Sequence, residues 1–391
     1  MKLEGIRVLD LSRFLPGPHL AMMMADHGAD VIKIEDPRTG DPARAIGPAE
    51  GGHTVYFRNA NRGKRGLAVD LKSGAGREAF MRLAETADVV LETFRPGVVD
   101  RLGIGYDAVS ARAPQVVYAS ISAFGQSGPY RDRPAHDLSV NALAGVASLG
   151  VDGDGKPAMA CLPPSDMGGS LMALAGILMA LLRRQTTGRG DCLDLAMFDA
   201  VVSWTPHVAG RVFAEDRAPE PSSERTQGGA AFYRPYRTRD GRYVTLGGGE
   251  MKFVVNFLEA VGRPDLIPLG REPAGPAQAP LHAFLEETFA ARTQAEWVAW
   301  FAGRDICFAP VLDLKEAFDD PHLAARGMVE RDAAGAAHLG IPIKFREEPG
   351  AIGPDAPALG AHSGEILREI GYDEAACRAL VADGIVRQAD D

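Results

Sequence analysis

Residues 5–35, GIRVLDLSRFLPGPHLAMMMADHGADVIKIE, decide the fold class of this chain. Residues 6–11 have the apolar pattern of a buried strand, and Pro16-Gly17-Pro18 breaks it. A helical stretch follows over residues 19–26, and residues 31–35 form the next strand pattern. Further strand patterns cover residues 66–71, 88–92 and 115–122, with a helical stretch over 74–85. This alternation predicts an α/β fold, a parallel sheet with helices on its faces.

The loop after the first strand argues against one common use of such a sheet. Dinucleotide-binding proteins carry the glycine fingerprint G-x-G-x-x-G at that point. Here the stretch is Arg13-Phe14-Leu15-Pro16-Gly17-Pro18. We therefore do not expect a nicotinamide-dependent dehydrogenase.

Length and composition restrict the number of domains and the kinds of partner. At 391 residues, two domains are expected, and the net charge of −10 argues against nucleic acid as a partner. The four cysteines lack the paired spacing of a zinc site, and no metal is expected. The longest apolar stretch, residues 171–182, is shorter than the roughly 20 residues needed to cross a bilayer. We read it as a helix buried on all sides, and with no signal segment expect a cytoplasmic protein with no membrane partner.

A polar stretch rich in Pro and Gly at residues 215–230 predicts a linker. Beyond it, residues 236–239 and 242–246 flank Asp240-Gly241 and predict a β-hairpin. We place a large domain at residues 1–225 and a smaller α+β domain at 226–325. Residues 326–391 are expected to return to the large domain.

Three acid–base residues stand beside turns of small residues: His136, Asp166 and Glu250. His136 and Asp166 precede amphipathic runs, so each is expected near a helix N-terminus, with Asp137 as a helix cap. The glycines at 168–169 would leave backbone N–H groups free to meet an enolate oxygen. A His and a carboxylate on opposite faces of one carbon can remove a proton from one side and return it to the other. Each residue alone also fits a plain cap or an exposed loop position.

Basic residues cluster over positions 58–72, and Arg95-Pro96-Gly97 follows a strand that ends at residue 92. Arginines in loops at strand ends suit phosphate or pyrophosphate groups. The same cluster also fits a solvated charged face.

Ordered motifs along nearly the whole chain resemble those of the class III CoA-transferase (CaiB/BaiF) family, which also contains the α-methylacyl-CoA racemases. The matching segments are Pro16-Gly17-Pro18, residues 28–35, Asn61-Arg62-Gly63-Lys64-Arg65, Val69-Asp70-Leu71-Lys72, Phe94-Arg95-Pro96-Gly97, Arg101-Leu102-Gly103, Phe124-Gly125-Gln126-Ser127-Gly128-Pro129, Thr187-Gly188-Arg189-Gly190, Asp240-Gly241-Arg242-Tyr243 and Leu359-Gly360-Ala361-His362.

The resemblance implies a Rossmann-like large domain built from both chain ends, a small domain, and a homodimer of interlocked ring-like chains. It implies an acyl-CoA thioester as the ligand, with no cofactor beyond its CoA moiety. The positions it implies for CoA binding are Arg38, Arg62, Lys72, Phe94, Arg95, Arg101, Phe124 and Gly125. One departure is Asp36, which stands where family members often have Arg; Arg38 follows two residues later.

The resemblance also bears on the reaction. Transferase-like members carry Tyr with Glu or Asp where this chain has His136-Asp137, whereas racemases carry His-Asp. Asp166 would be a proton carrier in a racemase and a covalent nucleophile in a transferase. Glu250 would hydrogen-bond the histidine, and the backbone N–H of Asp137 would meet the thioester oxygen. The leading hypothesis is a 2-methylacyl-CoA epimerase; the alternatives are a CoA-transferase and a CoA-binding scaffold without catalysis.

Overall fold

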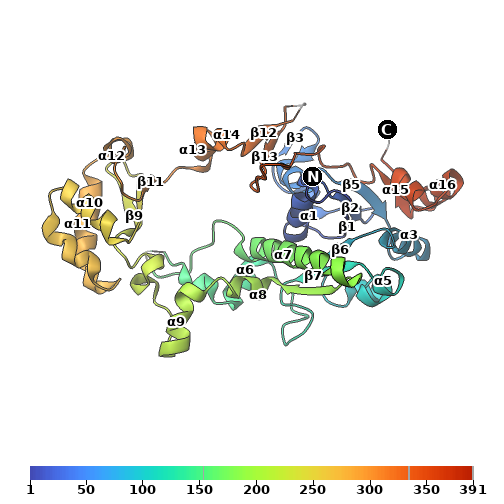
Figure 1. Ribbon diagram of the computed structural model, residues 1–391, viewed down its shortest axis with the longest axis horizontal. Coiled ribbons are helices and arrows are strands. Elements are labelled where there is room, and N and C mark those ends of the chain that lie inside the picture. Colours follow the sequence, from blue (N-terminus) through green and yellow to red (C-terminus); the bar gives the residue numbers. More distant parts are fainter. Residues whose placement is uncertain (153, 333–334, 390–391) are drawn as a thin grey trace. The chain divides into compact units, whose positions relative to one another are not determined.

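The computed structural model describes residues 1–152, 154–332 and 335–389 (Figure 1). The chain divides into two compact units, each described here by itself. Unit 1 comprises Met1–Ala144, Leu162–Ser203 and Pro321–Asp391. Unit 2 comprises Gly145–Cys161 and Trp204–Asp320.

A seven-stranded sheet forms the centre of unit 1. Its order is β14-β5-β2-β1-β6-β7-β8. All neighbours pair in parallel except β14, which is antiparallel to β5. The predicted α/β class is therefore confirmed, and the last strand comes from the C-terminal end of the chain. The strands are β1 (Arg7–Asp10), β2 (Asp30–Glu35), β5 (Arg65–Val69), β6 (Val89–Glu92), β7 (Val117–Ser122), β8 (Cys192–Ala196) and β14 (Val386–Arg387).

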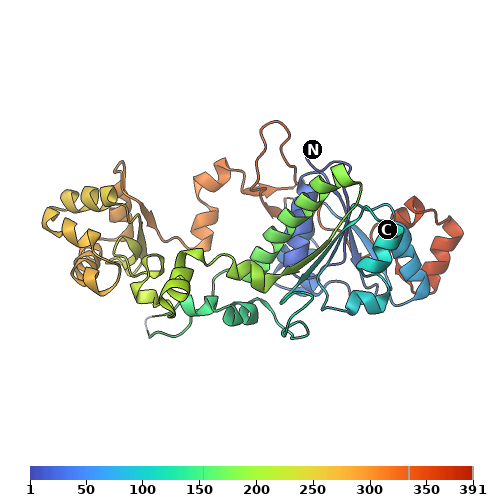
Figure 2. The same ribbon diagram turned by 60° about the horizontal axis from the view of Figure 1, so that its bottom comes forward.

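Helices cover both faces of this sheet, which explains why its central strands are apolar almost throughout. Figures 1 and 2 show α1 (Pro16–Asp26) and α7 (Pro164–Thr187) side by side on one face. The other face holds a continuous core in which α3 (Gly74–Ala84) and α5 (Tyr106–Arg112) meet the C-terminal helices. The remaining helices of unit 1 are α2 (Val55–Asn61), α4 (Val98–Leu102), α6 (Asp137–Leu143), α8 (Met197–Val202), α14 (Pro321–Ala325), α15 (Ser363–Glu369) and α16 (Glu374–Ala382).

Helix α7 corrects the expectation of a helix buried on all sides. Ala173, Ile177 and Leu181 are buried on one side of it, and the helix contacts α1, β7 and β8. The opposite side leaves large apolar side chains exposed. By length and composition alone α7 is also long enough to cross a membrane, a property that core helices share. The exposed side chains are Leu171, Met172, Leu178, Met179 and Leu182.

Unit 2 is built on a small antiparallel sheet. Strands β9 (Tyr233–Arg237) and β10 (Tyr243–Gly247) form the predicted hairpin, and β11 (Phe308–Pro310) completes the sheet. Gly241 occupies the turn with a φ of 80°, a left-handed conformation that glycine adopts without strain. An aromatic core packs the sheet against three helices. These are α10 (Met251–Ala260), α11 (Ala279–Ala290) and α12 (Gln294–Phe301).

The boundaries of the units differ from the predicted domain limits. The main segment of unit 2 is Trp204–Asp320, where residues 226–325 were predicted, and unit 2 also includes the earlier segment Gly145–Cys161. The polar stretch at 215–230 therefore lies inside unit 2, after α9 (Pro206–Glu215). Composition marks loops, whereas a domain boundary depends on which segments contact each other.

Candidate active site

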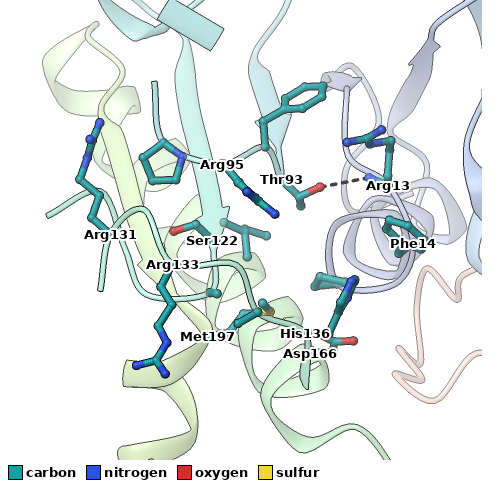
Figure 3. Close-up of a pocket in the computed structure, with 16 residues that line it drawn as sticks. Arg13, Phe14, Thr93, Arg95, Ser122, Arg131, Arg133, His136, Asp166 and Met197 are labelled. Carbon is teal, nitrogen blue, oxygen red and sulfur yellow. Dashed lines mark hydrogen bonds between the residues drawn. The ribbon is translucent and has the colours of Figure 1, made fainter. Parts of the chain in front are cut away.

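A cavity of about 250 Å³, called the small cavity below, lies within unit 1 (Figure 3). It brings together the loop after β1, the loop after β6, and the first residues of α6 and α7. His136 and Asp166, 30 positions apart in sequence, both line it. The other lining residues are Arg13, Phe14, Pro16, Thr93, Phe94, Arg95, Pro96, Ile121, Ser122, Ala123, Arg131, Arg133, Ala135 and Met197.

His136 stands at the start of α6 in an extended conformation. Its backbone oxygen accepts hydrogen bonds from the N–H groups of Ser139 (2.9 Å) and Val140 (3.1 Å). The capping position is therefore His136 itself, and the expectation that Asp137 caps this helix is wrong. The His136 ring meets the Phe14 ring in a T-shaped arrangement, with 5.9 Å between centroids and 87° between planes.

Asp137 instead caps the neighbouring helix. Its Oδ1 accepts hydrogen bonds from the backbone N–H groups of Ser165 (2.8 Å) and Asp166 (3.1 Å), and from Ser165 Oγ (2.6 Å). Its Oδ2 accepts a hydrogen bond from Asn141 Nδ2 (2.6 Å). The carboxylate thus ties the start of α6 to the start of α7. Because His136 and Asp166 stand at these two points, Asp137 fixes their spacing.

Asp166 is a partly buried carboxyl group in the first turn of α7. Burial, and then the negative charge of Asp137, raise the pKa of Asp166 to about 6. Both its protonated and ionised forms are consequently populated near neutral pH. Burial, helped by the charges of Asp166 and Asp41, also raises the pKa of Tyr56 to about 12. Nothing in the sequence had singled out Tyr56 or Phe14.

The backbone N–H groups available to an enolate oxygen differ from those expected at Gly168 and Gly169. Gly168 and Gly169 lie inside α7, and the N–H groups of the first turn are taken by Asp137. The absent side chain of Gly169 makes room for Met197, since an added Cβ would lie 2.8 Å from Met197 Cγ. Across the described part of the chain, no hydrogen-bond acceptor meets the N–H of Asp137. This is the donor that the family resemblance had assigned to a thioester oxygen.

Glu250 belongs to unit 2, where it precedes α10 as an exposed N-cap residue. Its carboxylate makes no capping hydrogen bond. The pairing of Glu250 with His136 stays a prediction.

A second cavity of about 730 Å³, called the large cavity, lies over the carboxyl ends of β2 and β5. It contains four of the predicted CoA contacts: Arg38, Lys72, Phe94 and Arg95. The two cavities share the lining residues Arg13, Phe94 and Arg95, so they adjoin each other. The Arg13 guanidinium lies 5.3 Å from the centroid of the Phe94 ring at this junction.

Arg38 is exposed and forms ion pairs with Asp36 (3.1 Å) and Asp70 (3.5 Å). The acid at position 36 therefore holds Arg38 at the rim of the large cavity. The shared charge leaves Arg38 less free for a phosphate than the resemblance alone would suggest. Lys72 is exposed, with no ion-pair partner in the described ranges.

Arg62 corrects the predicted binding set. Its side chain is buried, and its guanidinium pairs with both carboxylate oxygens of Asp26 (3.0 and 2.7 Å) and donates to the backbone oxygen of Leu339. It holds α1 to the C-terminal segment rather than facing a ligand. Three further predicted positions line neither cavity. These are Arg101 on α4, Phe124, which packs on Tyr130 and Phe198, and Gly125.

Comparisons with known proteins identify the family to which this chain belongs. Residues 3–363 match the model of CoA-transferase family III. The chain belongs to this family. It is 32% identical to the alpha-methylacyl-CoA racemase of Homo sapiens, over 99% of this chain and 98% of that protein. It is also 32% identical to the acetyl-CoA:oxalate CoA-transferase of Acetobacter aceti, over 95% of this chain and 96% of that protein.

A family III fold is confirmed by a solved structure. A CaiB/BaiF family protein from Brucella suis superposes with a TM-score of 0.81 at 30% identity, covering 94% of this chain and 99% of the other. Membership establishes an enzyme family that acts on CoA thioesters. Because racemases and transferases match at similar identity, family III membership leaves the reaction to be decided by the site.

Proposed function

We propose that this protein is an acyl-CoA epimerase that inverts the α-carbon of 2-methylacyl-CoA thioesters. The observation that supports it is the placement of His136 and Asp166 in one cavity, at two helix starts joined by Asp137. An imidazole and a carboxyl group are both competent to take up and to release a proton. Each is suited to act as base in one direction and as acid in the other.

The thioester carbonyl acidifies the α-hydrogen, so the step needs no metal or redox group. In one direction His136 removes the α-proton and Asp166 in its protonated form delivers a proton to the opposite face. In the reverse direction ionised Asp166 removes the proton and protonated His136 returns one. A pKa of about 6 suits Asp166 to both roles. The free N–H of Asp137 is the proposed donor to the enolate oxygen, which gains negative charge in the transition state.

The large cavity is the proposed site for the CoA moiety. Arg38, Lys72 and Arg95 supply positive charge there for phosphate groups. The residues shared between the cavities would then guide the pantetheine arm, and the thioester would enter the small cavity beside His136.

The decisive experiment is incubation with a chiral 2-methylacyl-CoA in heavy water. We expect deuterium at the α-carbon together with loss of configuration, followed by NMR and chiral chromatography over a panel of acyl chain lengths. Asp383→Asn changes an exposed residue at the C-terminal end of α16 and is the control variant, expected to give the same result as the parent protein. Retention of both hydrogen and configuration throughout the panel would exclude the epimerase.

The rival proposal is a CoA-transferase, which the equal identity to the Acetobacter aceti enzyme favours. Asp166 would attack the thioester, forming a mixed anhydride and releasing the CoA thiolate, which would attack the aspartyl carbonyl to free the first acid and leave an aspartyl-CoA thioester. The acceptor carboxylate would displace CoA from this thioester as a second mixed anhydride, and the thiolate would then attack the acceptor's carbonyl carbon, giving the new thioester and restoring Asp166. This reading predicts CoA exchange between a thioester and a free acid. It also predicts an Asp166 acyl adduct that hydroxylamine traps, detected by peptide mass spectrometry, without deuterium at the α-carbon.

We further propose that the protein is a cytoplasmic homodimer. The exposed apolar side of α7, with Met179 and Leu182 each 68% exposed, is a surface that a second chain would cover. Analytical ultracentrifugation is expected to give twice the mass of one 41.5 kDa chain. A stable monomer at micromolar concentration would contradict the dimer.

A further inference from the structure

The loop between β1 and α1 carries an unusual backbone conformation. Phe14 has a φ of 65°, one of two non-glycine residues with positive φ among those described. A side chain at such a φ is disfavoured, so the conformation persists only where the surroundings hold it. Residues held in this way often stand at functional sites, and Phe14 lines the small cavity.

Side-chain acceptors bind three consecutive backbone N–H groups of this loop. The N–H of Ser12 donates to Asp10 Oδ1 (3.0 Å), and that of Arg13 donates to Thr93 Oγ1 (3.1 Å). The N–H of Phe14 donates to Asp41 Oδ1 (3.3 Å). The loop is therefore fixed at each residue rather than at its ends alone.

The two aspartates are themselves fixed by buried lysines. Asp10 Oδ2 accepts a hydrogen bond from Lys64 Nζ (2.7 Å), and Asp41 Oδ2 accepts one from Lys33 Nζ (2.9 Å). All four side chains are fully buried. Lys33 Nζ also donates to the backbone oxygen of Ser12 (3.0 Å). Such fully paired, buried charges permit one arrangement only, and that arrangement sets the backbone of Phe14.

The Phe14 ring reaches the residue whose orientation matters most. His136 makes no side-chain hydrogen bond within the described segments, and its ring contact is the T-shaped packing with Phe14. Figure 3 shows the two side chains on the same side of the cavity, with Asp166 next to His136. Within unit 1, the packing against Phe14 is therefore the contact that constrains the plane of the imidazole, whether or not Glu250 of unit 2 also hydrogen-bonds one of its nitrogens.

We propose that Phe14 is a positioning residue for His136, held in its left-handed conformation by the buried charges of Asp10, Lys33, Asp41 and Lys64. The Phe14 ring sets the plane of the imidazole, so that one ring nitrogen faces the α-carbon of the substrate. Its effect on turnover rests on the proposed function, whereas its effect on the imidazole does not.

The test compares Phe14→Leu, which removes the ring but keeps apolar volume, with Phe14→Tyr, which keeps a ring. We expect Phe14→Leu to lower kcat for α-proton exchange by about 10- to 100-fold with KM changed less than about threefold, because misorientation affects the step and not binding. Phe14→Tyr is expected to restore most of the rate. Thermal melts establish that both variants are folded.

A second readout is independent of activity. In protein labelled with ¹⁵N-imidazole histidine, the His136 signal is assigned by its loss in His136→Asn, and its relaxation reports ring mobility. Greater mobility in Phe14→Leu but not in Phe14→Tyr supports the proposal. Equal mobility in Phe14→Leu and the parent protein overturns it, as does an unchanged kcat. If the parent protein exchanges no α-proton, the proposed function fails and the relaxation measurement alone decides the role of Phe14.

Discussion

Two groups of charged or titratable side chains in unit 1 differ in their burial and in the presence of ion-pair partners. The buried network consists of Asp10, Lys33, Asp41 and Lys64, in which Lys64–Asp10 (2.7 Å) and Lys33–Asp41 (2.9 Å) are ion pairs with no exposed side-chain surface. The pair His136 and Asp166 faces a cavity, and neither member has an ion-pair partner among the described residues. The two groups are linked through the loop that carries Phe14.

The difference teaches where chemistry is available. A buried charge with a partner contributes to one arrangement of the chain, and removing the partner is costly. A titratable group in a cavity without such a partner keeps its proton-transfer capacity for a ligand. Lys64 is fully buried beside its partner Asp10, whereas Asp166 is partly buried and faces a cavity. We therefore expect mutations of Lys64 to affect folding and mutations of Asp166 to affect catalysis.

The largest expected effect is on the cavity side of this comparison. Asp166→Asn keeps the size of the side chain but removes its ability to exchange a proton. We expect the rate of α-proton exchange to fall by about 10²- to 10⁴-fold, measured by NMR in heavy water, with cooperative unfolding retained. Asp383→Asn, on the exposed C-terminal side of α16, is the matched control. Full activity in Asp166→Asn would remove this residue from the mechanism.

The network side is tested by Lys64→Met, which leaves the Asp10 charge buried without its partner. We expect the free energy of unfolding to fall by about 3–5 kcal/mol, measured by urea denaturation. Lys72→Met is the control, since Lys72 is exposed at the large cavity and its loss should change stability by less than about 0.5 kcal/mol. Equal free energies of unfolding for the two lysine variants would contradict a stabilising role for the buried network.

The pH dependence of kcat/KM sharpens the comparison by separating the two proposed reactions. Proton transfer between His136 and Asp166 requires that the pair hold one proton in total, so activity should fall at both low and high pH. One limb should reflect the Asp166 pKa of about 6. Both directions should share this profile, because the equilibrium between epimers does not depend on pH. A transferase with ionised Asp166 as nucleophile should instead rise through about pH 6 and then level off.

The smallest expected effect is on stability. The pKa of Asp166 is higher in the folded protein, about 6, than the ordinary value of 3.8 for an aspartate, so folding favours its protonated form. The wild-type protein should therefore lose stability relative to Asp166→Asn as pH rises from about 4 through 6. The difference should reach roughly 1–2 kcal/mol after allowance for partial exposure. Urea denaturation at pH 4, 5, 6 and 7 measures this difference in the free energy of unfolding. A difference that does not change with pH would show that burial does not raise the pKa of Asp166.

Much of the fold was predictable from local pattern. The apolar runs at residues 6–11 and 31–35, and the turn at Asp240-Gly241, depend on neighbours in the sequence and appear where expected. The limits of the units were not predictable, because Gly145–Cys161 joins unit 2 through contacts with residues far along the chain. Similarly, the exposed side of α7 has the same apolar composition as its buried side.

For the candidate site, the sequence by itself determined which residue types were present: a histidine and an aspartate beside turns, with arginines near strand ends. Only the tertiary structure decided which of them have partners. Arg62 forms an ion pair with Asp26, and Asp137 accepts hydrogen bonds from the start of α7. His136 and Asp166 line one cavity instead. The physical reason is that the availability of a charged group depends on its burial and on its nearest opposite charge, both of which arise from chain segments distant in sequence.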